Sequence, residues 1–151
     1  MKSYICALIL IGILGVTPLS YGETENGSTS IEEVKNEAQD FLKAIGSYTT
    51  DKRDEAVKKA KEGLAILDKR IYALEARIEK NWDKMNEASR KETHENLRAL
   101  RKQRNQVAEW YGSMKTSSAD AWDHIKNGFS DAYRSLEDAW EKSENEFNDN
   151  N

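Results

Sequence analysis

The chain repeats itself every eleven residues near its C-terminus. Residues 120–130, DAWDHIKNGFS, are followed directly by residues 131–141, DAYRSLEDAWE, and both segments begin with Asp-Ala and carry large apolar residues at matching positions. Eleven residues make three turns of about 3.67 residues, which is close to the 3.6 residues per turn of an α-helix. The repeat therefore predicts one nearly straight helix over residues 119–147, with its aromatic side chains on a single face.

The apolar residues of this helix form the candidate interaction face of the chain. Its members are Trp122, Ile125, Phe129, Tyr133, Leu136, Trp140 and Phe147. Such a stripe usually packs against another helix of the same molecule, and the expected partners are Trp110, Tyr111 and Met114. The alternative is a surface for lipids or client proteins. The opposite side of the helix is acidic, whereas lipid-surface helices usually carry Lys and Arg there, so attachment to an anionic bilayer is disfavoured.

A second pattern, with a period of seven residues, runs through the middle of the chain. It places apolar side chains at Val57, Leu64, Ile71, Ile78 and Met85. A heptad seam sustained over this length indicates a coiled coil or a long helical hairpin. The seam is also the candidate interface of a homodimer.

The second seam position of each heptad lies three residues after the first. At this position Asn81 is a polar exception. A buried polar seam residue can fix register or partner number. The alternative is that Asn81 is simply half-exposed.

The apolar pattern falters at residues 86–94 and resumes out of phase at Leu97. No Gly or Pro stands there, and a turn normally needs such a breaker. We therefore expect one continuous helix over residues 51–116, with a bend of the chain as the alternative. A capping box that starts at Ser30 begins the first helix, residues 31–48. The expected fold is all-α, an elongated helical hairpin or coiled coil in which shorter helices fold back antiparallel on a long central one.

Charge is divided unevenly along the chain, whose formal net charge is −4. Acidic residues outnumber basic ones in residues 23–50 and 118–151, whereas basic residues outnumber acidic ones in residues 51–117. This order suits acidic outer helices that fold back on a basic central helix, and in particular residues 119–147 packed against about 87–115. Exposed ion pairs stabilise little, so we expect charge to select the arrangement and apolar burial to stabilise it.

The N-terminal segment has the three-part pattern of a secretory signal peptide. A basic start precedes an uncharged apolar run over residues 5–16, and Ser20 and Gly22 are the small residues of a cleavage site. The apolar run is shorter than the about 20 residues of a membrane span, so an uncleaved anchor is the less favoured alternative. We expect cleavage after Gly22 and export to the periplasm or the extracellular space.

Removal of residues 1–22 takes away Cys6 and Pro18, the only Cys and the only Pro of the chain. The exported chain then cannot form a disulfide, although export delivers it to an oxidising compartment. Its expected organisation is a flexible leader over residues 23–29 and a single helical domain over residues 30–151.

Side chains suited to catalysis or metal binding are scarce. The two histidines are His94, which lies among charged residues, and His124, which follows Asp120 by one helical turn. Two ligands are too few for a structural metal site, which takes about four. The sequence offers no cysteine nucleophile and no glycine-rich phosphate loop after residue 22. We expect no enzyme activity, no metal and no cofactor.

A basic cluster in the second half of the chain raises the possibility of a phosphate-binding patch. The cluster comprises Arg98, Arg101, Lys102 and Arg104. Acidic flanking segments and the expected export argue against nucleic acid as its partner. We expect the cluster to pair with an acidic helix of the same molecule.

The last half of the chain combines recurrent helical segments with spaced aromatic residues. These are LEARI at 74–78, LRALRKQR at 97–104 and SSADAW at 117–122, together with Trp82, Phe129 and Trp140. In this combination the chain resembles small exported bacterial coiled-coil proteins, some of which carry a generic stress-response label. The resemblance implies no catalytic residues. The Leu-Thr-x-x-Gln signature of periplasmic stress-adaptor and metal-sensing helical hairpins is absent from the sequence.

These observations favour a non-catalytic exported interaction protein that acts in envelope stress protection or as a holdase. The alternative is an apolipoprotein-like protein that binds lipid surfaces. Sensing of a metal or a small molecule is a third option. The partners expected are therefore proteins or a second copy of the chain, and a membrane surface is disfavoured.

Overall fold

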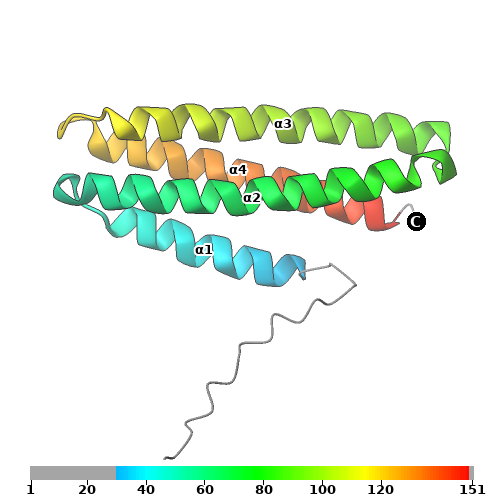
Figure 1. The fold of residues 1–151 in the computed structure, drawn as a ribbon, viewed down its shortest axis with the longest axis horizontal. Helices are drawn as coiled ribbons and strands as arrows, with labels where there is room; N and C mark the ends of the chain where they lie inside the picture. Colours follow the sequence, from blue (N-terminus) through cyan, green and yellow to red (C-terminus); the bar gives the residue numbers. More distant parts are fainter. Residues whose placement is uncertain (1–29, 150–151) are drawn as a thin grey trace, which may run out of the picture.

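The computed structural model describes residues 30–149, which fold into an elongated bundle of four helices (Figure 1). The helices are α1 (Ile31–Ser47), α2 (Arg53–Asn81), α3 (Glu87–Lys115) and α4 (Trp122–Asp149), with 3₁₀ turns at Thr50–Lys52 and Trp82–Lys84. Each helix runs antiparallel to the one before it, as in an up-down-up-down bundle. The all-α prediction is confirmed. The expected signal peptide, its cleavage site and the leader lie outside the described residues.

The chain reverses direction between α2 and α3, so the expected continuous helix over residues 51–116 is wrong. Met85 is extended, with ψ of 141°, and is buried. The next residue, Asn86, caps α3, because its side-chain oxygen accepts a 2.8 Å hydrogen bond from the Ser89 N–H. An Asn cap satisfies one of the N–H groups that a helix start leaves without a partner. The reversal therefore needs neither Gly nor Pro.

Side chains on both sides of the reversal hold it in place. The Arg90 Nε donates to the Trp82 carbonyl at 2.9 Å, and the Arg90 guanidinium lies 5.5 Å from the centre of a Trp82 ring. Asn81 donates to the Arg77 carbonyl at 2.9 Å and is half-buried. Asn81 thus satisfies a carbonyl at the end of α2, and the half-exposed alternative describes it better than a buried register residue.

The heptad seam of α2 faces the interior of the bundle. Leu64, Ile71, Ile78 and Met85 are buried and Val57 is half-buried. Most of the seam shares one core with apolar residues of α3, namely Leu100, Val107 and Met114. The chain's own helices therefore cover the seam, and a homodimer through it would require the bundle to open.

The most extensive packing joins α3 and α4, which confirms the expected antiparallel contact between residues 119–147 and about 87–115. Helix α1 packs more extensively on α4 than on α2. It has 17 residues, against 29 in α2, 29 in α3 and 28 in α4. Figure 1 shows that α1 accordingly covers only part of the length of the bundle.

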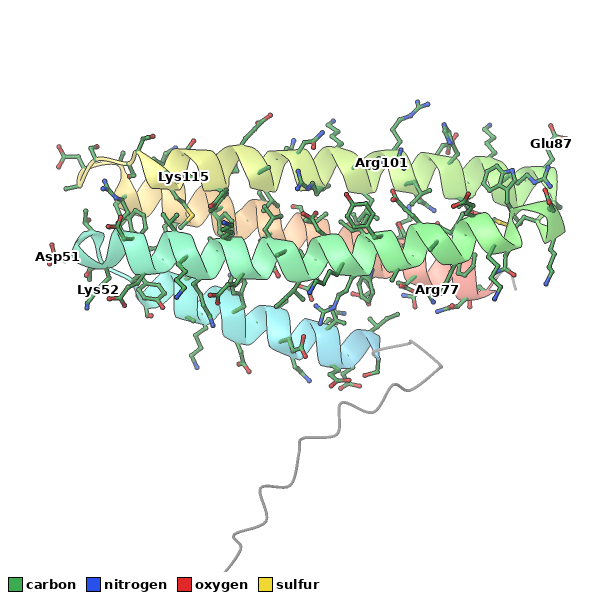
Figure 2. All side chains as sticks on the ribbon, in the orientation of Figure 1. Asp51, Lys52, Arg77, Glu87, Arg101 and Lys115 are labelled. Carbon is green, nitrogen blue, oxygen red and sulfur yellow. The ribbon has the colours of Figure 1, made fainter. Side chains whose placement is uncertain are left out.

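Charged side chains project outward along α1 and α3 (Figure 2), and several join neighbouring helices. The ion pairs between helices are Glu37–Arg70, Lys35–Glu141, Asp68–Arg104, Glu75–Arg101 and Arg77–Glu144. Two of the basic-cluster residues, Arg101 and Arg104, thus pair with carboxylates of α2, a helix inside the segment that is basic as a whole. The expected pairing with an acidic outer helix is corrected in this respect, because the reversal places α2 and α3 side by side.

Replacing Asn86 by Ala removes the acceptor of the Ser89 N–H and leaves the start of α3 uncapped. We expect the free energy of unfolding to fall by about 1 kcal/mol, the usual effect of losing an Asn cap. Urea denaturation followed by circular dichroism measures this change. The matched control is Asn105→Ala, because Asn105 is exposed within α3 and Ala favours the helix there. Unchanged stability of Asn86→Ala would contradict the role given to the cap.

Candidate functional site

The candidate interaction face of α4 is buried inside the bundle. The exposed fraction is 5% or less for Trp122, Phe129, Tyr133, Leu136, Trp140 and Phe147, and Ile125 is half-buried. The expected partners share this core: Met114 is buried in it, and Trp110 and Tyr111 pack against it. The stripe is therefore core in the closed bundle, and a partner can reach it only if a helix moves.

Two side chains of α4 hold the C-terminal end of α1. The Lys126 ammonium donates to the Gly46 carbonyl at 2.9 Å and to the Tyr48 carbonyl at 3.0 Å. The indole N–H of Trp122 donates to the same Tyr48 carbonyl at 3.0 Å. A cation that satisfies the last carbonyls of a helix also complements the negative end of its dipole. This end of α1 is thus anchored by hydrogen bonds as well as by apolar packing.

Two glycines within helices allow an aromatic ring of a neighbouring helix to pack directly against the helix backbone. A Cβ built on Gly63 of α2 would lie closer than 3.0 Å to the ring of Phe41, and one built on Gly128 of α4 would lie closer than 3.0 Å to the ring of Trp110. The ring of Phe41 in turn lies 4.7 Å from that of Tyr133, centre to centre. A glycine inside a helical pattern signals close approach, but the sequence does not show which ring fills the space.

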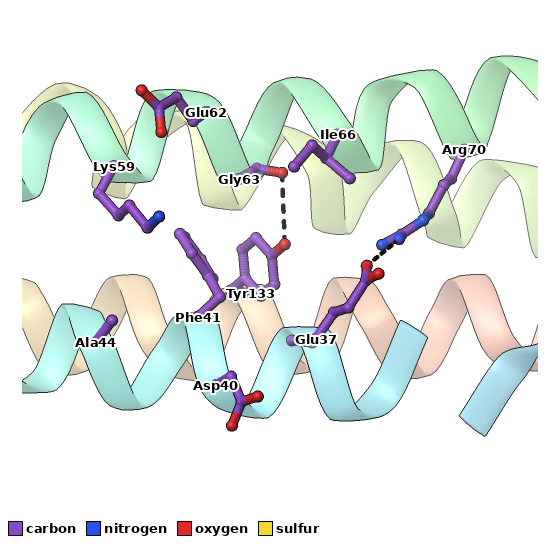
Figure 3. A pocket seen from close by; sticks show the side chains of 11 residues that line it. Glu37, Asp40, Phe41, Ala44, Lys59, Glu62, Gly63, Ile66, Arg70 and Tyr133 are labelled. Atoms are coloured by element: carbon purple, nitrogen blue, oxygen red, sulfur yellow. Dashed lines mark hydrogen bonds and ion pairs between the residues drawn. The ribbon is translucent and has the colours of Figure 1, made fainter. Parts of the chain in front are cut away.

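A groove of about 460 Å³ lies between α1 and α2 (Figure 3). Apolar atoms of Phe41, Gly63 and Ile66 line it, and Ile66 is 48% exposed, which is unusual for a large apolar residue of this chain. The Tyr133 hydroxyl lies at the back of the groove and donates to the Gly63 carbonyl at 3.4 Å. Burial raises the pKa of Tyr133 above its usual value, so its hydroxyl stays protonated. Sequence reasoning missed this groove, because its walls lie on two separate helices.

A buried carboxyl lies where α1 covers α4. Glu137 is only 7% exposed. Burial raises the pKa of this carboxyl to about 7, and the charges of Asp138 and Glu141 add to the rise, whereas Lys35 and Arg70 oppose it. The ion pair between Lys35 and Glu141, at 3.0 Å, lies at the edge of the same contact. The α1–α4 contact therefore contains a group that changes charge near neutral pH.

The histidines stand apart from the buried groups. His124 is exposed, and its ring meets the ring of Trp110 at 5.7 Å in an edge-to-face arrangement. His94 is also exposed and lies 3.4 Å from the Arg98 guanidinium. Within residues 30–149, Asp120 and His124 are not joined by a third residue in a group suited to a metal ion. No helix in this described range is both long and apolar enough to cross a membrane.

No protein-family model, curated protein or solved structure matches the chain. Two features of the bundle bear on its function. One is the short helix α1, which packs over part of the apolar face of α4. The other is the groove that separates α1 from α2.

We expect Gly→Ala substitutions to change the free energy of unfolding in opposite directions, depending on whether an aromatic ring packs against the glycine. Ala favours a helix over Gly by about 1 kcal/mol, but overpacking typically destabilises by about 1–3 kcal/mol. We expect Gly63→Ala and Gly128→Ala to lower the free energy of unfolding. The control, Gly112→Ala, should raise it by up to about 1 kcal/mol, because no atom lies within 4 Å of the added Cβ. Chemical denaturation compares them, and a stabilising Gly128→Ala would show that Trp110 is not seated there.

The raised pKa of Glu137 predicts that stability falls as the pH rises from about 4.5 to about 7. In this window the unfolded chain loses the Glu137 proton while the folded chain retains it, and ionisation then favours the unfolded state. Solvent screens part of the penalty, so we expect a loss on the order of 1–2 kcal/mol, complete above pH 7.

Urea denaturation of Glu137→Gln at several pH values tests this assignment. The variant should be more stable than the parent at pH 8, with the difference shrinking towards pH 5. Glu95→Gln is the control, because Glu95 is exposed on α3. A pH-independent difference between Glu137→Gln and the parent would contradict the assignment.

Proposed function

We propose that the chain is a non-catalytic exported interaction protein that acts as a holdase in envelope stress protection. In this proposal α1 is a cover that lifts from α4 and bares the aromatic stripe for an unfolded client. The observation that supports this proposal is the uneven packing of α1. This helix packs chiefly on α4 and is separated from much of α2 by a groove. Export rests on the pattern of residues 1–22.

The contacts of α1 favour opening from its N-terminal end. Lys126 and Trp122 anchor the C-terminal end of α1 through three hydrogen bonds. At the other end lies the ion pair between Lys35 and Glu141, whose side chains are 46% and 23% exposed, and such pairs stabilise by only about 0–1 kcal/mol. The helix would therefore peel away from its free end while its last turn stays attached.

Lifting α1 would uncover aromatic surface of α4. Phe41 of α1 lies 6.3 Å from Phe129 and 4.7 Å from Tyr133, measured between ring centres. Each large side chain removed from such a core costs roughly 2 kcal/mol, so the bundle stays closed at rest. A client that binds the bared stripe supplies the free energy that holds it open, because a ligand stabilises the state it prefers.

The apolipoprotein-like alternative uses the same opening but a lipid partner. The outer side of α4 carries the exposed carboxylates of Asp123, Asp131 and Asp138. Helices that lie on lipid surfaces usually carry basic residues there. This charge favours a protein client over an anionic membrane. Flotation with liposomes separates the two proposals, and we expect no flotation with neutral or anionic vesicles.

The substitution Leu42→Ala tests whether α1 is the cover. Leu42 is buried in α1 with 5% exposure, and Leu100, buried in α3, provides the matched control Leu100→Ala. Both substitutions should destabilise by about 2–5 kcal/mol, but only Leu42→Ala should loosen the cover. We expect Leu42→Ala to suppress the heat aggregation of a client enzyme, measured by light scattering, more strongly than the parent and Leu100→Ala do. Equal suppression by the two variants, or none by any of the three proteins, would contradict the proposal.

A further inference from the structure

The groove between α1 and α2 has its charges arranged around an apolar floor. Figure 3 shows the Lys59 ammonium pointing toward the ring of Phe41, while the carboxylates of Glu62 and Asp40 point away from it. Among the described residues, Lys59 has no ion pair or hydrogen bond within the fold. The ammonium at this end of the groove is therefore available to a ligand.

The opposite end of the groove is closed by a neutralised pair. Arg70 of α2 donates to the Glu37 carboxylate of α1 across the groove. Between this pair and Lys59 lie the Phe41 ring, the Gly63 backbone and the half-exposed Ile66 side chain. The groove thus has one unpaired cation, one apolar stretch and one end without net charge.

We propose that this groove binds a single anionic amphiphile. The anionic head, a carboxylate or a group of similar charge, pairs with the Lys59 ammonium. The apolar body lies along Phe41, Gly63 and Ile66 and ends near the Arg70–Glu37 pair. The volume of about 460 Å³ falls within the roughly 300–1,000 Å³ of small-molecule sites, which combine apolar walls with a few polar groups that orient the ligand.

The contact between Gly63 and the Phe41 ring is part of this site. Because Gly63 lacks a Cβ, the Phe41 ring lies directly against α2 and forms the floor. The Phe41 ring also contacts Tyr133, so the floor is continuous with the core. The site exists in the closed bundle. It therefore goes beyond the holdase proposal and does not depend on the lifting of α1.

Isothermal titration of the full exported chain with decanoate tests the proposal. Decyltrimethylammonium and decanol serve as cationic and neutral probes of the same chain length, with the two ionic probes below their micelle concentrations and decanol below its solubility limit. We expect saturable binding of one decanoate per chain and weaker binding of the other two. Perturbation of the Phe41 and Tyr133 ring signals in NMR spectra should place decanoate in the groove.

Two neighbouring lysines give a matched pair of variants. Lys59→Gln should weaken decanoate binding about three- to fivefold, the effect of losing one exposed ion pair. Lys58→Gln should leave it unchanged, because Lys58 is exposed and does not line the groove. Circular dichroism verifies that both variants fold. Equal affinities of the two variants, equal binding of the cationic probe, or no saturable binding would overturn the proposal.

Phosphatidylglycerol vesicles distinguish a monomeric ligand from a membrane. A ligand held in the groove between α1 and α2 predicts that the chain does not float with the vesicles while decanoate still binds. Flotation that is lost in Lys59→Gln would assign Lys59 to a membrane contact and would overturn the proposal of a single bound amphiphile.

Discussion

The reversal between α2 and α3 is the constraint from which the other contacts of the bundle follow, and the hydrogen bond from the Ser89 N–H to Asn86 is one of the contacts that fix it. Once the chain turns back, the heptad seam of α2 and the apolar positions of α3 lie on the same core. The stripe of α4 then packs chiefly against α3, with α1 across part of its length. Without the reversal, the seam would face solvent or a second chain, and the acids of α2 would not reach Arg101 and Arg104.

Sequence periodicity predicted α1, α4 and the burial of the aromatic stripe, because these depend on local patterns of apolar residues. The α3–α4 contact was predicted from the order of acidic and basic segments along the chain. The reversal was expected only as the alternative to a continuous helix, because a capping Asn followed by helix-favouring residues resembles an interruption within one helix. The phase change before Leu97 was the available signal, and a change of chain direction produces such a change. The packing of aromatic rings against the two glycines was not predicted, for another reason. Gly63 and Gly128 indicate close contacts in the sequence. Which rings make these contacts, Phe41 and Trp110, depends on which helices become neighbours.

The groove and the buried carboxyl arise from one property of α1, its more extensive packing on α4 than on α2. Because α1 packs less on α2, Phe41 must span the gap and leaves space beside it. Because α1 lies close to α4, it buries Glu137 near its own Lys35. Neither consequence could be read from the sequence, in which Lys59 and Glu137 look like ordinary members of solvated helix faces. Lys59, with its ammonium over an apolar floor, shows how packing alone can give a surface charge a specific position.

The hydrogen bonds from Trp122 and Lys126 to the end of α1 join residues 74 to 80 positions apart in the chain. Contacts with such separation form late in folding, because a long loop must close first. Synthesis delivers the chain from its N-terminus, so α1 emerges before the other described helices but cannot make its main contact until α4 has followed. Until then its apolar face, with Val34, Leu42 and Ile45, can pack only against α2, with which α1 makes the smaller contact. Among the described helices, the first to be synthesised is thus the last to gain its full set of contacts, and the bundle stays incomplete until α4 has been made.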